Sequence, residues 1–159
     1  MRLTQEHAGA PEEIVVVLRI ENATIDWEVF MVNKRPTRLA ESVFFSFVPA
    51  PASMQPDGWT VQVLGSSMDP TDTLGKDGSS SLNSTYGGSP HLRGVEAARW
   101  HGTEGAFSLT SLDVPVLCMG KPSPFDTPRT QPPDMTLGVH YNIFQNIWNT
   151  NCARFLCPQ

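Results

Sequence analysis

The chain lacks a long apolar run: the longest extends from Ile14 to Leu18 and ends at Arg19. A membrane helix needs about 18 or more apolar residues, so the sequence predicts none. Charge is also scarce, at 17% of residues against a typical ~25%. Acidic residues outnumber basic ones by 16 to 11, and a net charge of −5 without a basic patch disfavours nucleic acid or an anionic membrane as a partner.

Cysteine is scarce as well. Cys118, Cys152 and Cys157 form an odd and widely spaced set, which is not a disulfide framework. Cys152 and Cys157 could close a small loop, but we interpret all three as free or buried thiols. A C-x-x-C pair is absent, which excludes a zinc ribbon.

Motifs for metal-assisted or nucleophilic catalysis are missing too. The four histidines are far apart in sequence, without an H-x-D or H-E-x-x-H pattern, so we predict no metal site and no cofactor in this chain. A G-x-S-x-G elbow is absent, and the acidic residues form no local pair of the kind that sugar hydrolysis uses. We therefore assign no catalytic residue.

The N-terminal residues 1–12 are polar and acidic, and we interpret them as a loose leader. They lack the apolar centre of a secretory signal, so the chain as written is predicted to be cytoplasmic. A truncated N-terminus would leave secretion open. In that case the triplets that begin at Asn22 and Asn83 are acceptors for glycosylation.

The sequence does contain short β-branched and aromatic segments between Gly- and Pro-rich turns. The clearest strand is 59–64, where Trp59, Val61 and Val63 alternate with residues of the other face. No segment sustains a helical period, and long loops rich in Gly, Ser and Pro are predicted over 65–90 and 120–138. Strands are predicted over 13–21, 25–33, 42–48, 59–64, 91–100, 107–112, 114–119 and 138–148. The predicted fold class is all-β, an antiparallel β-sandwich with residues 13–159 as a single domain.

Tryptophans and side-chain amides offer the candidates for ligand binding. A tryptophan on a buried alternating strand belongs in the core, but Trp148 lies in a segment dense in amides. Buried amides must be paired, so this density is unfavourable for a core. The amides either line a polar cleft or tie the last strand to neighbouring loops. They are Asn142, Gln145, Asn146, Asn149 and Asn151.

Three segments taken in order resemble a known family. They are 33–47 (NKRPTRLAESVFFSF), 91–95 with 109–116 (HLRGV and LTSLDVPV), and 138–151 (GVHYNIFQNIWNTN). Their order and content resemble the C-terminal β region of the domain-of-unknown-function family 5054, whose members are similar to glycoside hydrolase family 38 α-mannosidases. The sequence departs from the family pattern at four positions: Ala40, Arg93, Gln145 and Asn149.

The resemblance implies a galactose-mutarotase-like β-sandwich beside an N-terminal barrel that carries the zinc and the nucleophile. The barrel is not in this chain, so the resemblance implies an accessory domain that contacts carbohydrate and is not catalytic by itself. Its expected partners are carbohydrate and the barrel of the same protein. The candidate sugar-binding residues are Asn146, Trp148, Asn151, His91, Arg38 and Glu41. Arg38 and Glu41 are three residues apart, so an ion pair between them is an equal interpretation.

Two alternatives remain open. The first is a stand-alone carbohydrate-binding module, which needs only the aromatic and amide side chains. The second is an inactive remnant or scaffold domain, whose former barrel interface is exposed. An interface without its partner presents apolar surface, so this alternative predicts an exposed apolar patch.

Overall fold

The computed structural model describes the backbone of residues 2–3 and, in full, residues 9–35, 37, 40–48, 58–70, 91–103, 105–125 and 132–147. Contacts divide the chain into two compact units, Met1–Leu39 and Ala40–Gln159. The described residues form antiparallel strands and short 3-10 turns without an α-helix, so the all-β class is confirmed. The boundary between the units falls within the range that the sequence assigns to one domain.

The first unit is a long hairpin with a short third strand. β2 (Glu13–Glu21) pairs with β3 (Thr24–Val32), and β1 (Arg2–Leu3) adds to the other edge of β2. β1 thus lies within the segment interpreted as a loose leader. The strands turn at Asn22, whose φ is 53°. Two-residue hairpin turns need a positive φ at their first central position, which asparagine tolerates better than most residues.

The two faces of this hairpin differ in chemistry. Directly opposite residues of an antiparallel pair lie on the same face. One face therefore carries only apolar side chains, and we name it the apolar hairpin face. Its four cross-strand rows are Ile14 with Met31, Val16 with Val29, Leu18 with Trp27, and Ile20 with Ile25.

The opposite face of the hairpin is mixed. It carries an ion pair between Arg19 and Glu28, and this hydrogen-bonded guanidinium lowers the pKa of the Glu28 carboxyl. Phe30 and Val32 also lie on this mixed face.

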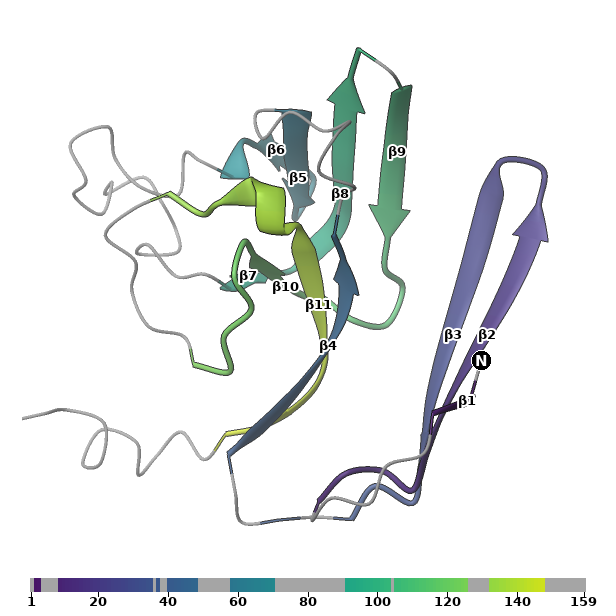
Figure 1. Ribbon diagram of the computed structural model, residues 1–159. Helices are drawn as coiled ribbons and strands as arrows, with labels where there is room; N and C mark the ends of the chain where they lie inside the picture. Colours follow the sequence, from purple (N-terminus) through teal and green to yellow (C-terminus); the bar gives the residue numbers. More distant parts are fainter. Residues whose placement is uncertain are drawn as a thin grey trace, which may run out of the picture. The chain divides into compact units, whose positions relative to one another are not determined.

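The second unit contains two four-stranded antiparallel sheets (Figure 1). The first, which we name the β4 sheet, has the order β4-β11-β10-β7, and the second, the β5 sheet, has the order β6-β5-β8-β9. The strands of the β4 sheet are β4 (Glu41–Phe47), β11 (Val139–Asn146), β10 (Val116–Met119) and β7 (His91–Arg93). The strands of the β5 sheet are β6 (Ser66–Met68), β5 (Trp59–Val63), β8 (Val95–Gly102) and β9 (Gly105–Thr110).

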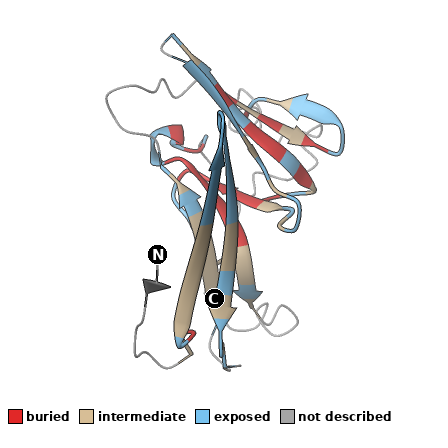
Figure 2. Cartoon of the chain, turned by 90° about the vertical axis from the view of Figure 1, so that its right-hand side faces the viewer, coloured by how far each residue is buried: buried red, intermediate tan, exposed pale blue. Residues whose placement is uncertain are grey.

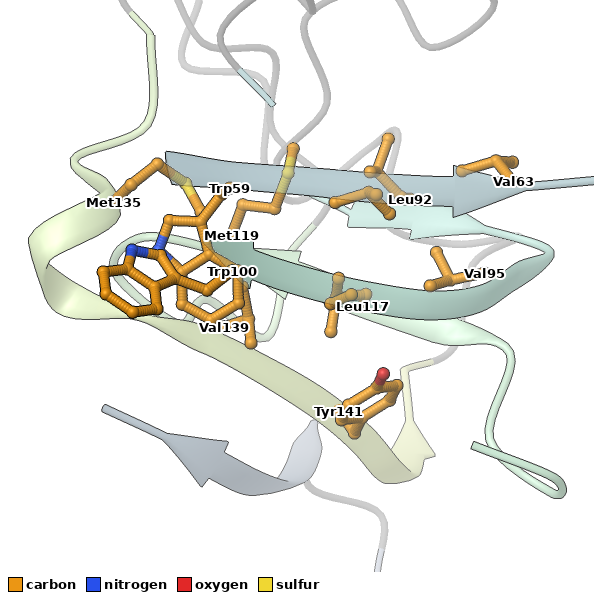
Figure 3. Close-up of a cluster of buried hydrophobic side chains, with 12 residues drawn as sticks. Trp59, Val63, Leu92, Val95, Trp100, Leu117, Met119, Met135, Val139 and Tyr141 are labelled. Carbon is orange, nitrogen blue, oxygen red and sulfur yellow. The ribbon is translucent and has the colours of Figure 1, made fainter. Parts of the chain in front are cut away.

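The inner faces of the two sheets form one core, which makes this unit a β-sandwich (Figure 3). The predicted alternation on β5 is confirmed, since Trp59, Val61 and Val63 are all buried. Trp59 and Trp100 lie with Met135 at one end of the core, whereas Val63 and Val95 lie at the other. Figure 2 shows the buried residues gathered on the strands of the sandwich, while β2 and β3 are intermediate or exposed.

Trp100 fits this core because two glycines leave room for it. A Cβ atom at Gly58 or at Gly102 would collide with the Trp100 indole. The ring stacks against Phe107 of β9 with their centroids 5.8 Å apart. Both tryptophans on alternating strands, Trp59 and Trp100, are therefore core residues.

The segment predicted as a long loop over 65–90 begins with a strand instead. β6 pairs with β5 through a turn in which Leu64 and Gly65 have φ values of 48° and 78°. A type I′ turn needs positive φ at both central residues, and a bulky residue such as Leu64 rarely adopts it. The prediction missed β6 because its turn does not carry the usual Asn-Gly or Asp-Gly signal. Residues 71–90 lie outside the described part of the chain.

Tyr141 ties the two sheets together. Its side chain extends from β11 into the core, and its hydroxyl donates to the backbone carbonyl of Leu109 in β9, at 3.1 Å. Burial raises the pKa of Tyr141 to about 12. The phenol is therefore held in its neutral, hydrogen-bonding form.

This raised pKa predicts how stability depends on alkaline pH. Above pH ~10 the unfolded chain loses the Tyr141 proton while the folded chain keeps it, so the free energy of unfolding falls until the pH reaches about 12. In Tyr141→Phe this contribution disappears, so urea unfolding measured between pH 8 and pH 11 should show a shallower decline than wild type. An equal decline in both proteins would contradict the assignment.

Candidate functional site

Three of the six candidate sugar-binding residues lie in the described part of the chain. Glu41 begins β4, Asn146 ends β11, and His91 begins β7, all in the β4 sheet. Arg38, Trp148 and Asn151 lie outside the described residues.

The structure brings Glu41 and Asn146 together. They are direct cross-strand partners at one end of the β4–β11 pair, although about a hundred residues separate them in sequence. Opposite residues in an antiparallel pair have Cβ atoms about 4.5–5.5 Å apart. Both residues are partly buried and take part in further contacts, so a carboxylate and an amide meet at the end of this sheet.

A β-bulge sets this pairing. Val139 to Asn142 pair with β4 in one register, and the register shifts by one between Asn142 and Phe144. The first register would place Asn146 opposite Ala40, whereas the shifted register places it opposite Glu41. Bulges commonly re-aim side chains in this way, and nothing in the sequence marks this one.

His91 lies in a different environment, within a row that crosses the β4 sheet. Register pairs His91 with Cys118, Cys118 with His140, and His140 with Ser46. Because side chains alternate along a strand, this row lies on the face opposite to that of Leu92, Leu117 and Tyr141 in the core. His91, Cys118 and His140 are nevertheless buried.

Residues 120–125, which we name the covering segment, lie over the buried members of this row, His91, Cys118 and His140, while Ser46 is exposed. The Nε2 atom of His140 lies 2.6 Å from the carbonyl oxygen of Gly120, and the Nε2 atom of His91 lies 2.8 Å from that of Ser123. A carbonyl oxygen only accepts, so both Nε2 atoms carry a hydrogen and donate it. His140 also uses Nδ1, at 2.8 Å from the Ser46 hydroxyl.

The covering segment thus places His91 away from solvent, with only 1% of its surface exposed. Its role in sugar binding remains a prediction. The sequence analysis did not identify Cys118, His140 and Ser46 as a group. The sequence did contain one indication of this group. His140 lies between the core residues Val139 and Tyr141, so alternation along the strand places its side chain on the opposite face of the sheet.

The side-chain amides of β11 differ in whether they form hydrogen bonds. Gln145 Nε2 donates to the Pro124 carbonyl at 3.3 Å, which ties the last strand to a neighbouring loop, one of the two predicted alternatives. Asn142 is 8% exposed, and its side-chain nitrogen and oxygen both lack a hydrogen-bond partner among the described residues. Each unsatisfied buried group costs about 1–3 kcal/mol. The polar side chain of Asn142 therefore lowers the free energy of unfolding of the chain.

The described residues also bear on metals and membranes. In the described ranges, no group of three or more His, Cys, Asp or Glu side chains is placed to hold a metal ion. Within the same part of the chain, no helix has the length and apolar character to cross a membrane.

Comparison with known proteins found no match to this chain among family models, curated proteins or solved structures.

The unpaired side-chain amide of Asn142 leads to a prediction about stability. Replacing Asn142 with leucine, which is close to it in size, removes two unpaired polar atoms, so we expect a gain of about 1–2 kcal/mol in the free energy of unfolding. Chemical unfolding in urea measures the change. The matched control is Asn146→Leu, which removes an amide that has contacts and should bring no gain. A loss of stability in Asn142→Leu would show that the amide has a partner, such as a bound water.

Proposed function

We propose that this chain is a carbohydrate-contacting domain that is not catalytic by itself, the C-terminal accessory part of an α-mannosidase-like glycoside hydrolase. The galactose-mutarotase-like form of the β-sandwich belongs to this proposal, as does the zinc-dependent N-terminal barrel outside this chain. The observation that supports it is the pairing of Glu41 with Asn146 at one end of the β4 sheet.

A neighbouring carboxylate and amide suit sugar hydroxyls chemically. The carboxylate accepts two or more hydrogen bonds, while the amide both donates and accepts. Each sugar hydroxyl both donates and accepts, so it can bond to either of these side chains. Glu41 and Asn146 could therefore hold the hydroxyls of a single residue of a glycan.

Trp148 supplies the second element of the proposed site. It follows Asn146 by two residues in the sequence, and an indole offers an apolar face for the C–H groups of a sugar ring. Arg38 precedes Glu41 by three residues, and Asn151 follows Trp148 by three. The proposed division of labour is that the amide and carboxylate fix orientation while the indole supplies contact area.

A second candidate, a scaffold domain that binds another protein surface, is favoured by the apolar hairpin face. The two rows of this face nearest the hairpin turn consist of residues that are among the exposed large apolar residues of the chain: Leu18, Ile20, Ile25 and Trp27. Contiguous exposed apolar patches often mark sites of interaction. The two candidates are compatible, because the hairpin and the Glu41–Asn146 pair lie in different units.

Glycan binding tests the proposal. In calorimetric titrations of the purified chain with mannose oligosaccharides, we expect Glu41→Gln, Asn146→Ala and Trp148→Ala each to weaken binding about 5- to 30-fold, since a lost hydrogen bond or stacking contact is worth ~1–2 kcal/mol. The matched control is Glu96→Gln, which changes an exposed carboxylate on β8 and should leave affinity unchanged.

Two results would reject the proposal. One is wild-type affinity in folded variants of Glu41, Asn146 and Trp148. The other is zinc-dependent release of nitrophenol from an aryl mannoside by the purified chain, because that activity would make the chain itself an enzyme.

A further inference from the structure

We infer that the buried amide of Asn142 is the polar group of a second sugar-binding site, which lies on the outer face of the β4 sheet, the face turned away from the core. The site takes neighbouring hydroxyls of one sugar residue. The inference rests on the proposed function for the class of ligand, and it adds a site beyond the six candidate residues. The Glu41–Asn146 pair does not depend on this site, so either one can fail without the other.

The position of Asn142 in the sheet leaves its amide without a polar neighbour in its own row. Asn142 follows His140 by two residues and precedes the bulge, so both side chains lie on the outer face. The cross-strand partner of Asn142 on β4 is Phe44. On the other side, the register between β10 and β11, continued by one residue, sets Val116 beside Asn142. The amide therefore lies between an aromatic and an aliphatic side chain, and neither forms hydrogen bonds.

The polar neighbours of Asn142 along β11 bond to the covering segment instead. His140 and Gln145 donate to backbone carbonyls of that segment at 2.6 Å and 3.3 Å. Both polar atoms of the Asn142 amide are buried without a hydrogen-bond partner among the described residues. The hydroxyl of Ser42, which lies opposite Gln145 on the same face, is buried and unpaired as well. Three unpaired polar atoms thus share one face of the β4–β11 pair.

This unpaired polarity indicates a function. Native proteins pair the great majority of their buried polar atoms, so each exception needs a physical reason. A leucine is close to asparagine in size and would remove the cost at Asn142. Side chains that lower stability in this way are concentrated at functional sites, where a ligand is the missing partner. We therefore interpret the Asn142 amide as a group that binds a ligand.

The chemistry of the site indicates which ligand it takes. The amide oxygen accepts and the amide nitrogen donates, so the ligand must offer a donor and an acceptor close together. Neighbouring sugar hydroxyls do so, because each hydroxyl both donates and accepts. The Phe44 ring offers an apolar surface to the C–H groups of the sugar ring. Ser42 lies two residues from Phe44 along β4, about 7 Å away, so its hydroxyl borders the same part of the face.

The face also favours an uncharged ligand. Apart from the two histidines, Arg93 is the one ionisable side chain with a formal charge among the described residues of this sheet face, and it is exposed at the end of β7. Two strand spacings, about 10 Å, separate Arg93 from Asn142. A charge buried without a partner is costly, so a phosphate or carboxylate beside Asn142 is unfavourable. Hydroxyls that bond to the amide avoid this cost.

The amide lies close enough to the surface for a sugar to reach it. Asn142 is 8% exposed, Phe44 is partly exposed, and Gln145 is exposed. The contact from Gln145 to the Pro124 carbonyl, at 3.3 Å, is longer than the histidine contacts of 2.6 Å and 2.8 Å to the same segment. We therefore expect the Pro124 end of the covering segment to move when a sugar enters.

Asn142→Leu tests the site because binding and stability should change in opposite directions. In calorimetric titrations with mannose oligosaccharides, this variant should bind about 10- to 30-fold more weakly than wild type, since two hydrogen bonds are lost. Its midpoint of urea unfolding should rise, which a misfolded variant would not show. Ser42→Ala should weaken binding by a smaller factor without loss of stability. The matched control is Gln62→Leu, which removes an amide from the β5 sheet and should leave affinity unchanged.

Nuclear magnetic resonance gives a direct measure of contact. The side-chain NH2 signals of Asn142 are identified by their absence from the spectrum of Asn142→Leu. They should shift when the mannose oligosaccharide is added to wild type, whereas the NH2 signals of Gln62 should not.

The outcomes separate this inference from the proposed function. Wild-type affinity in Asn142→Leu, together with weaker binding in Glu41→Gln, would overturn the inference and leave the proposed Glu41–Asn146 site in place. Weaker binding in Asn142→Leu with wild-type affinity in Glu41→Gln would support the inference and reject that site. A wild-type chain that binds no mannose oligosaccharide would overturn both. A lower urea midpoint in Asn142→Leu would overturn the inference, because the amide would then have a partner within the protein.

Discussion

The structure depends on one constraint, that a sheet face of apolar side chains must be covered. The sandwich meets it where its two sheets pack together, and a separate segment covers a row of buried polar side chains. Its two sheets cover each other's inner faces, with Leu117 and Val61 fully buried between them, and residues 120–125 cover the outer face of the β4 sheet. The apolar hairpin face is as uniformly apolar as a core strand, and Leu18, Ile20 and Ile25 on it are exposed.

Covering the outer face of the β4 sheet gives that face its unusual chemistry. The covering segment brings backbone carbonyls over the sheet, and these need donors, which His91 and His140 supply. The same strand that carries His140 then shifts register at its bulge and ends with Asn146 opposite Glu41. One strand, β11, therefore provides core residues, the His140 and Gln145 contacts to the covering segment and half of the proposed sugar site.

The sequence predicted those features that depend on local pattern. Strand β2 was predicted with its observed bounds, and the burial of Trp59, Val61 and Val63 follows from their alternation. It could not predict features set by tertiary pairing. β6 depends on Leu64 in a left-handed conformation, and the partner of Asn146 depends on a bulge. The run from Ile14 to Leu18 is typical of a strand that is buried on both faces, but Val15 and Val17 lie on the mixed face of the hairpin.

Amide hydrogen exchange tests most directly whether burial beneath a covering layer sets the local stability of each strand. Dilute protein should show slow exchange in β5, β8, β10 and β11 and fast exchange in β2 and β3, because local stability follows buried apolar contact. Strong protection of β2 and β3, equal to that of the sandwich strands, would contradict the account.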